Sequence, residues 1–119
     1  SYTIGESVLL TKNFPNQTAA LLKKAGINME APTIIAKTGW TTDELKEQLS
    51  RTRLAVPFDF VTLLIGVNNQ YRGRSADEYA QQFEELLQQA IGYAGGNTNH
   101  VIVLSIPDWG VTPFAEGRN

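Results

Sequence analysis

Short apolar runs alternate along the chain with stretches in which apolar residues recur every three or four positions. The apolar, β-branched runs lie at residues 33–36, 58–65 and 101–106. Parallel strands, which are buried on both faces, read as continuous apolar runs of this kind. The alternation predicts an α/β fold, a three-layer α/β/α sandwich in which helices cover both faces of a parallel sheet.

Local start and stop signals set the bounds of the expected helices. Phe14-Pro15 places a proline in the first turn of a helix that Gly26 ends. Residues 41–44 and 75–78 each match a capping box, in which a hydroxyl oxygen accepts a backbone N–H and a glutamate reaches back. Gly95-Gly96 ends the last helix. Its apolar face has the clearest helical spacing and comprises Tyr79, Phe83, Leu86, Leu87, Ala90, Ile91 and Ala94.

Composition narrows the class of protein. The chain has 119 residues, 42% of them hydrophobic and 18% charged, with a net charge of -2 and no cysteine. These values are typical of one globular domain, and they exclude disulfides, thiolate metal sites and a cysteine nucleophile. The small net charge without a basic cluster argues against nucleic-acid binding. No apolar run approaches the ~20 residues of a transmembrane helix, and the compartment stays unknown.

Polar and aromatic residues gather directly after each apolar run. Residues 38–41, 66–72 and 107–110 are rich in glycine, asparagine and tryptophan. Such segments leave a parallel sheet at one edge, where open α/β sheets bind ligands. Glycine and asparagine also serve ordinary turns. The pattern alone therefore leaves both a binding site and simple turn chemistry open.

The sequence letters of these segments carry a resemblance to a known family. The chain opens Ser1-Tyr2-Thr3-Ile4-Gly5-Glu6, Gly39 stands in Lys-Thr-Gly-Trp-Thr-Thr, and residues 66–69 read Gly-Val-Asn-Asn. In this order they resemble the serine, glycine and asparagine blocks of the GDSL-like lipases and acylhydrolases, the SGNH hydrolase superfamily. The first block looks cut immediately before the family's serine. The resemblance covers the whole chain and implies the flavodoxin-like α/β/α fold of that superfamily.

What the resemblance implies is ester hydrolysis through an acyl-serine intermediate. Ser1 would attack the carbonyl of a small-molecule ester. The backbone N–H groups of Ser1 and Gly39 and the side-chain amide of Asn68 would stabilise the oxyanion. No metal or organic cofactor is implied. The residues expected to line the substrate pocket are Tyr2, Trp40, Asn69, Tyr71, Arg72 and Trp109.

The chain departs from the family pattern at two places. Asn69 stands where the family usually has aspartate, which removes a carboxylate but leaves the Asn68 amide. The Asp-x-x-His block is absent, and the single histidine, His100, precedes the last expected strand. At ~3.3 Å per residue, that strand puts His100 roughly 20 Å from the carboxyl edge of the sheet.

Residues 1–119 are expected to form one hydrolase-like domain that is incomplete at both ends. Further segments or a companion chain would supply the first strand and the histidine.

Two other functions fit parts of the same pattern. Because the base histidine is missing, the chain could be a non-catalytic flavodoxin-like ligand-binding domain or a degenerate hydrolase. Alternatively, the α-amine of Ser1 could serve as its own base, as in N-terminal-nucleophile hydrolases. Those enzymes stack two antiparallel sheets, whereas the alternation here indicates a parallel one. Labelling by a fluorophosphonate separates an active serine hydrolase from a binding module.

Overall fold

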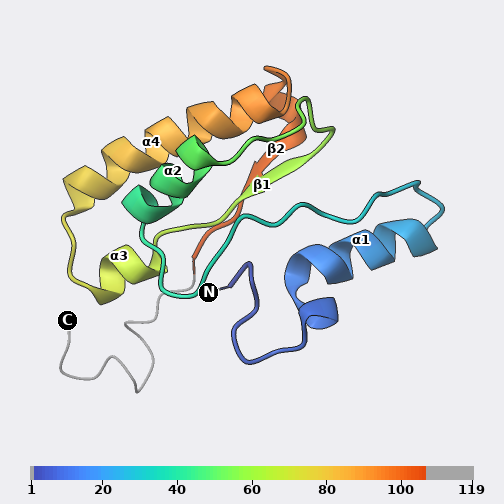
Figure 1. The fold of residues 1–119 in the computed structure, drawn as a ribbon, viewed down its shortest axis with the longest axis horizontal. Coiled ribbons are helices and arrows are strands. Elements are labelled where there is room, and N and C mark those ends of the chain that lie inside the picture. Colours follow the sequence, from blue (N-terminus) through green and yellow to red (C-terminus); the bar gives the residue numbers. More distant parts are fainter. Residues whose placement is uncertain (1, 107–119) are drawn as a thin grey trace. The chain divides into compact units, whose positions relative to one another are not determined.

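The computed structural model describes residues 2–106 of the chain. The chain divides into two compact units, Ser1–Trp40 and Thr41–Asn119. Figure 1 labels the α-helices and strands and colours the chain along the sequence, from blue at the N-terminus to red toward the C-terminus. Within residues 2–106, the only regular elements of the first unit are helices, and the two assigned strands lie in the second unit.

The first unit is built around one α-helix. A short 3₁₀ helix, η1 (Leu10–Lys12), leads into α1 (Phe14–Lys24). Asn13 caps α1, because its side-chain oxygen accepts the N–H of Asn16 at 3.1 Å. The chain leaves the helix through Gly26, whose φ of +90° favours glycine. The helix that the sequence predicts after residue 14 is confirmed.

Residues 33–36 do not form the strand that their β-branched side chains predict. They are extended, but no strand is assigned among residues 2–40 of the structure. A strand exists only when its backbone groups bond to a neighbouring strand, and β propensity alone does not supply that neighbour. The prediction for this segment is therefore wrong in this structure.

The second unit holds a parallel sheet and the remaining helices. Strands β1 (Val61–Leu63) and β2 (Val101–Val103) pair in parallel with Val61 opposite Val101, and the Leu104 N–H extends the ladder to the Leu63 carbonyl at 2.9 Å. Both strands are shorter than the apolar runs that predicted them. Up to residue 106, the elements of this unit are α2 (Thr42–Arg51), β1 (Val61–Leu63), α3 (Val67–Tyr71), α4 (Ala76–Tyr93), η2 (Thr98–His100) and β2 (Val101–Val103).

A capping box sets the start of α2, and a serine N-cap sets the start of α4. The backbone N–H of Thr41 donates to Glu44 Oε1 at 3.0 Å, which completes the box at α2. At α4 the hydroxyl of Ser75 accepts the N–H of Glu78 at 3.3 Å. Each cap satisfies backbone groups that the first helical turn leaves without an intrahelical partner. The predicted helices after residues 41 and 75 are confirmed.

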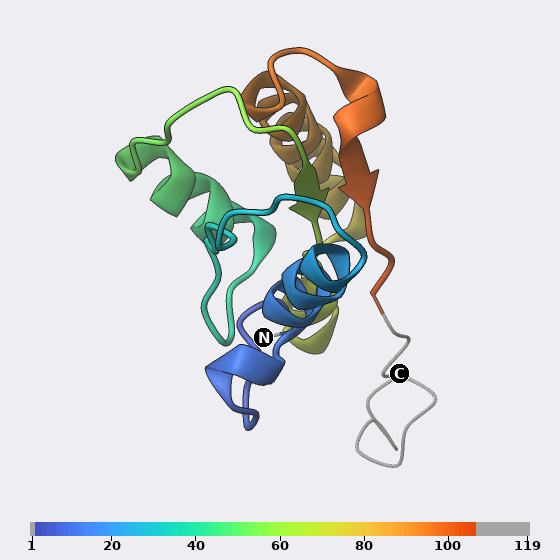
Figure 2. The same ribbon diagram turned by 90° about the vertical axis from the view of Figure 1, so that its right-hand side faces the viewer.

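The core of the second unit lies where α4 packs against α2 and β1 (Figures 1 and 2). Its buried apolar residues are Leu45, Leu63, Leu86, Ala90 and Ala94. The sheet itself is less covered than the sequence predicts, since Ile102 and Val103 of β2 are 44% and 47% exposed. Burial of the strands on both faces is thus not seen within the described part of this unit.

Candidate active site

Gly66 lies between β1 and α3, at a position where both the backbone conformation and a neighbouring side chain favour glycine. It is the N-cap of α3 and has a φ of +135°, a region that favours glycine. A Cβ here would lie 2.7 Å from Cε2 of the Tyr79 ring and 2.8 Å from its hydroxyl oxygen. That hydroxyl donates to the Ile65 carbonyl at 3.0 Å, and burial raises the pKa of Tyr79. At neutral pH Tyr79 is therefore a protonated donor that packs against a residue without a side chain.

The predicted oxyanion donor Asn68 lies on the first turn of α3. The sequence pattern placed this segment after a strand and predicted no helix in it, whereas residues Val67–Tyr71 form a helix of five residues. The side chain of Asn68 is half-buried. A helix this short is not stable by itself in water. Contacts with other elements must therefore hold α3 in place, and a pattern of apolar spacing could not have indicated it.

The Asn69 side chain forms hydrogen bonds within the protein, whereas the sequence predicted that it contacts the substrate. The side chain is 3% exposed. Its Oδ1 accepts the N–H of Thr42 at 3.0 Å, and its Nδ2 donates to Thr42 Oγ1 at 2.9 Å. Thr42 is the first residue of α2, where backbone N–H groups lack intrahelical partners. Asn69 thus satisfies one of those groups and ties α3 to α2.

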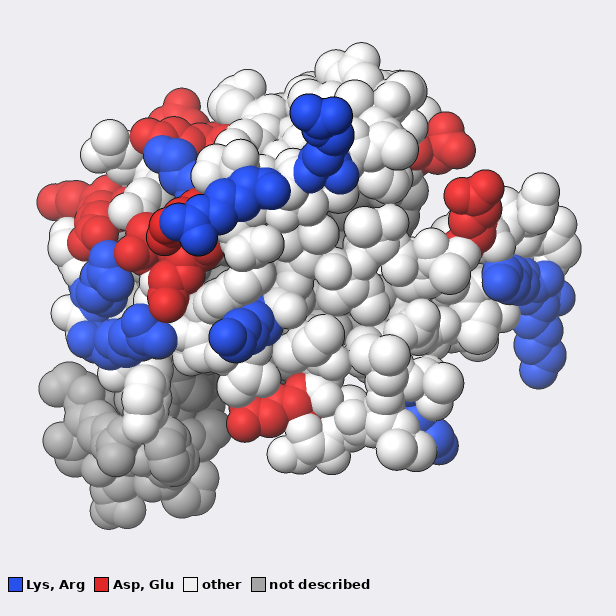
Figure 3. Space-filling model, viewed as in Figure 1, with Lys and Arg blue, Asp and Glu red and all other residues white. Residues whose placement is uncertain are grey.

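Arg72 also forms an ion pair within the protein. Its guanidinium Nη1 lies 3.2 Å from Glu44 Oε1, and Arg74 Nη2 lies 2.6 Å from Glu78 Oε1 and 3.4 Å from Asp43 Oδ1. Figure 3 shows side chains of opposite charge interspersed on the face that it views. The Thr41 hydroxyl holds the pKa of Asp43 below its ordinary value, and the Thr41 backbone N–H does the same for Glu44. These contacts belong to the junction of α2, α3 and α4.

Three of the predicted site residues lie in the part of the first unit that the structure describes. Gly39 has a φ of +91° in a turn that the Trp40 N–H closes on the Lys37 carbonyl at 3.3 Å. Trp40 is half-buried, and Tyr2 is 42% exposed. The predicted nucleophile, Ser1, lies outside the described residues.

Asn13 anchors the loop that follows Ser1, a role that the sequence reasoning missed. It is 2% exposed, and its Nδ2 donates to the Ile4 carbonyl at 3.3 Å. A Cβ on Gly5, whose φ is +79°, would lie 2.7 Å from Cβ of Asn13. Asparagine directly before Phe14-Pro15 is a helix N-cap signal, and it was available in the sequence.

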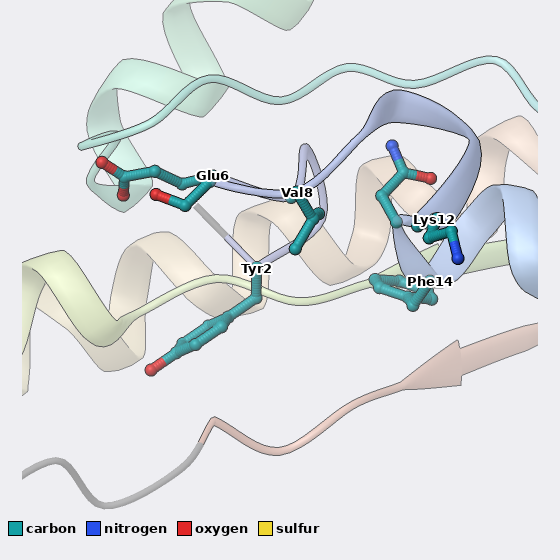
Figure 4. Close-up of a pocket in the computed structure, with 8 residues that line it drawn as sticks. Tyr2, Glu6, Val8, Lys12 and Phe14 are labelled. Atoms are coloured by element: carbon teal, nitrogen blue, oxygen red, sulfur yellow. The ribbon is translucent and has the colours of Figure 1, made fainter.

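An open pocket of about 360 Å³ lies within the first unit. Figure 4 shows Glu6 and Lys12 toward its two sides and Val8 between them, with Tyr2 and Phe14 below. The lining thus combines charge of both signs with aromatic and aliphatic surface. One of the lining residues, Tyr2, was predicted to line the substrate pocket, and it directly follows the predicted nucleophile in sequence.

The comparison with protein families agrees with the sequence blocks. The model of the GDSL-like lipase/acylhydrolase family matches residues 1–119, the whole chain. The chain belongs to this family. Neither a search of curated proteins nor a search of solved structures finds a match. Membership gives the chain the α/β fold class of SGNH hydrolases, consistent with its helices and parallel strand pair, and supports ester-type hydrolysis at the level of the family.

His100 of this GDSL-like family member lies at the amino end of the sheet. It is the last residue of η2, and Val101 directly after it pairs with Val61 at the start of β1. Its Nε2 lies 3.3 Å from Nδ2 of Asn97. Asn68, in contrast, follows the carboxyl end of β1. The structure does not bring the histidine and the predicted oxyanion donor together.

Two predicted substrate-binding residues of this family member remain, Tyr71 and Trp109. Tyr71 ends α3 and is 47% exposed, and Trp109 lies outside the described residues. Among residues 2–106 no group of three or more acidic or histidine side chains is arranged to hold a metal ion. Over the same residues, every helix is too short or too polar to pass through a membrane.

Proposed function

We propose that this GDSL-like hydrolase cleaves carboxylic esters through an acyl-serine intermediate formed on Ser1. The observation that carries the proposal is the position of Asn68. It follows the carboxyl end of the parallel strand β1, five residues after Leu63, on the first turn of α3. This edge is where open α/β sheets bind their ligands. The order of the family's serine, glycine and asparagine positions along the chain supports the same assignment.

The donors suit the charge that develops in the reaction. When the Ser1 hydroxyl attacks the ester, the carbonyl oxygen becomes an oxyanion that neutral N–H groups can stabilise. The Asn68 amide donates without a charge of its own that would need desolvation. Gly39 offers a backbone N–H in a turn with φ of +91°, and its missing Cβ lets a substrate oxygen approach the main chain.

The general base is proposed to come from the family's Asp-x-x-His block, outside residues 1–119. The only histidine in the chain, His100, lies at the opposite end of β1 and β2 from Asn68. A base must come within hydrogen-bond reach of the hydroxyl that it deprotonates. His100 at the amino end of the sheet does not suit that task.

The substrate-binding role is proposed for the aromatic residues rather than for the whole predicted set. Tyr2 and Tyr71 are both partly exposed, and Trp40 is half-buried beside Gly39 in sequence. Asn69 and Arg72 bind Thr42 and Glu44, so their polar groups serve the fold. Trp109 keeps its predicted role as a proposal.

Replacement of Asn68 tests the proposal. We predict that Asn68→Ala in the full-length protein lowers kcat on p-nitrophenyl esters by about 10²–10³, the usual cost of removing one oxyanion donor. Its melting temperature should stay close to that of the wild type. A matched control is Asn99→Ala, an exposed asparagine in η2, which should keep wild-type turnover. Wild-type kcat in Asn68→Ala would defeat the assignment.

A further inference from the structure

A closed circuit of hydrogen bonds runs through Asn69 within the second unit. The Asn69 amide donates to the Thr42 hydroxyl, which donates to Gln82 Oε1. Gln82 Nε2 donates to Glu78 Oε1 at 3.2 Å, and Glu78 accepts from Arg74 at 2.6 Å. The backbone N–H of Arg74 returns to the Asn69 carbonyl at 2.9 Å. The circuit thus links α2, α3 and α4, and both its first donor and its last acceptor belong to Asn69.

Two residues of this circuit, Thr42 and Asn69, are buried. Thr42 is 0% exposed and Asn69 is 3% exposed. Hydrogen bonds between such groups are hard to replace with water, so they restrict the conformations of the elements that carry them. The Asn69 amide matches Thr42 with one acceptor and one donor, which fixes its orientation as well as its position.

The direction in which the Asn68 side chain points depends on the hydrogen bonds between Asn69 and Thr42. Successive residues are about 100° apart around an α-helix, so the inward direction of Asn69 determines where Asn68 points. With five residues, α3 has too few internal bonds to hold that direction alone. Rotation or fraying of α3 would move Asn68 while leaving α2 and α4 intact.

We infer that Asn69 and Thr42 are positioning residues that hold the Asn68 amide in its oxyanion-binding direction. The inference rests on the proposed function, because it assumes that Asn68 is a donor. Neither residue is expected to touch the substrate. Their contribution should therefore appear in kcat through Asn68, because a donor displaced by about 1 Å can lose up to about 10²-fold in rate.

The test compares two single variants of the full-length protein with their matched controls. Asn69→Ala removes the amide, and Thr42→Val removes only the hydroxyl while the backbone N–H of residue 42 stays. Each should lower kcat about 10- to 100-fold on a p-nitrophenyl ester, with KM changed less than about threefold. Thr42→Ser keeps a hydroxyl and should restore most of the activity. The control Thr62→Val, at an exposed position of β1, should leave kcat unchanged.

A double-mutant cycle separates positioning from general loss of structure. In an Asn68→Ala background the donor is already gone, so Asn69→Ala and Thr42→Val should each lower kcat by less than about threefold. An equal loss in both backgrounds, or no loss from either single variant, would overturn the inference. Wild-type kcat in Asn68→Ala alone would instead overturn the proposed function. If Asn69→Ala does not fold, the Thr42→Val cycle gives the same decision.

Discussion

Gly66 connects β1 to α3 with a φ of +135° and lies against the ring of Tyr79. We predict that Gly66→Ala lowers the free energy of unfolding by at least about 2 kcal/mol. The new methyl group would meet Tyr79 at 2.7 Å in a backbone region that side chains avoid. Urea denaturation followed by circular dichroism measures the change.

Gly92 provides the matched control for this substitution. It lies in α4, and a Cβ there meets nothing within 4 Å. Gly92→Ala should therefore stabilise the protein by about 0.5–1 kcal/mol, because alanine is the better helix former. A Gly66→Ala protein as stable as the wild type would contradict the constraint described for Gly66.

The neighbouring amides of Asn68 and Asn69 show what single residues reveal before a structure is known. Both follow the apolar run that contains β1, and both were expected at the site. The residue types could not distinguish them, because the distinction depends on the rotation of α3. That helix is set by the circuit through Thr42 and by Gly66 against Tyr79, contacts between residues distant in sequence.

At the scale of elements, the start of α2 depends on carboxylates with depressed pKa values. The Thr41 backbone N–H, with help from its hydroxyl and from Arg72, lowers the pKa of Glu44 below its ordinary value of 4.5. A carboxyl whose folded pKa is depressed adds stability above its unfolded pKa and loses it as the pH falls through the folded value. The contribution of Glu44 should therefore be present at neutral pH and vanish in acid.

Glu44→Gln isolates this charge, since glutamine also completes a capping box. We predict that the variant is less stable than the wild type near neutral pH by under about 1 kcal/mol, because the group is largely exposed. The difference should shrink as the pH falls below about 4.5 and disappear once the pH lies below the lowered pKa of Glu44 in the folded protein. Urea denaturation across this range measures it. A difference that stays constant down to pH 3 would contradict the assigned cause.

The helices were predictable from the sequence because their signals are local. The caps at Thr41 and Ser75 and the glycines after α1 and α4 act within a few residues of the helix ends. The strands depend on partners elsewhere in the chain. Residues 33–36 have the composition of a strand without its ladder in this structure, and β1 and β2 are paired over only part of their apolar runs. α3 gave no periodic signal, because its stabilising contacts are tertiary.

At the scale of the whole molecule, the alternating pattern and the three sequence blocks gave the fold class and the family. The family model spans the chain, and the strands in the second unit pair in parallel as the α/β pattern requires. The assembled site could not be predicted to the same depth. Its serine, glycine and asparagine are distant in sequence, and only Asn68 and Gly39 lie within residues 2–106. Spacing identifies such residues without fixing the geometry between them.

The central claim is that Ser1 is the nucleophile of a family ester hydrolase. The most direct measurement is the reaction of the folded, full-length protein with a fluorophosphonate, followed by tandem mass spectrometry of its peptides. We predict one phosphonyl adduct, located on Ser1, that forms at least about tenfold more slowly in Asn68→Ala because an oxyanion donor is lost. No adduct in the folded protein, or an adduct on a different residue, would contradict the claim.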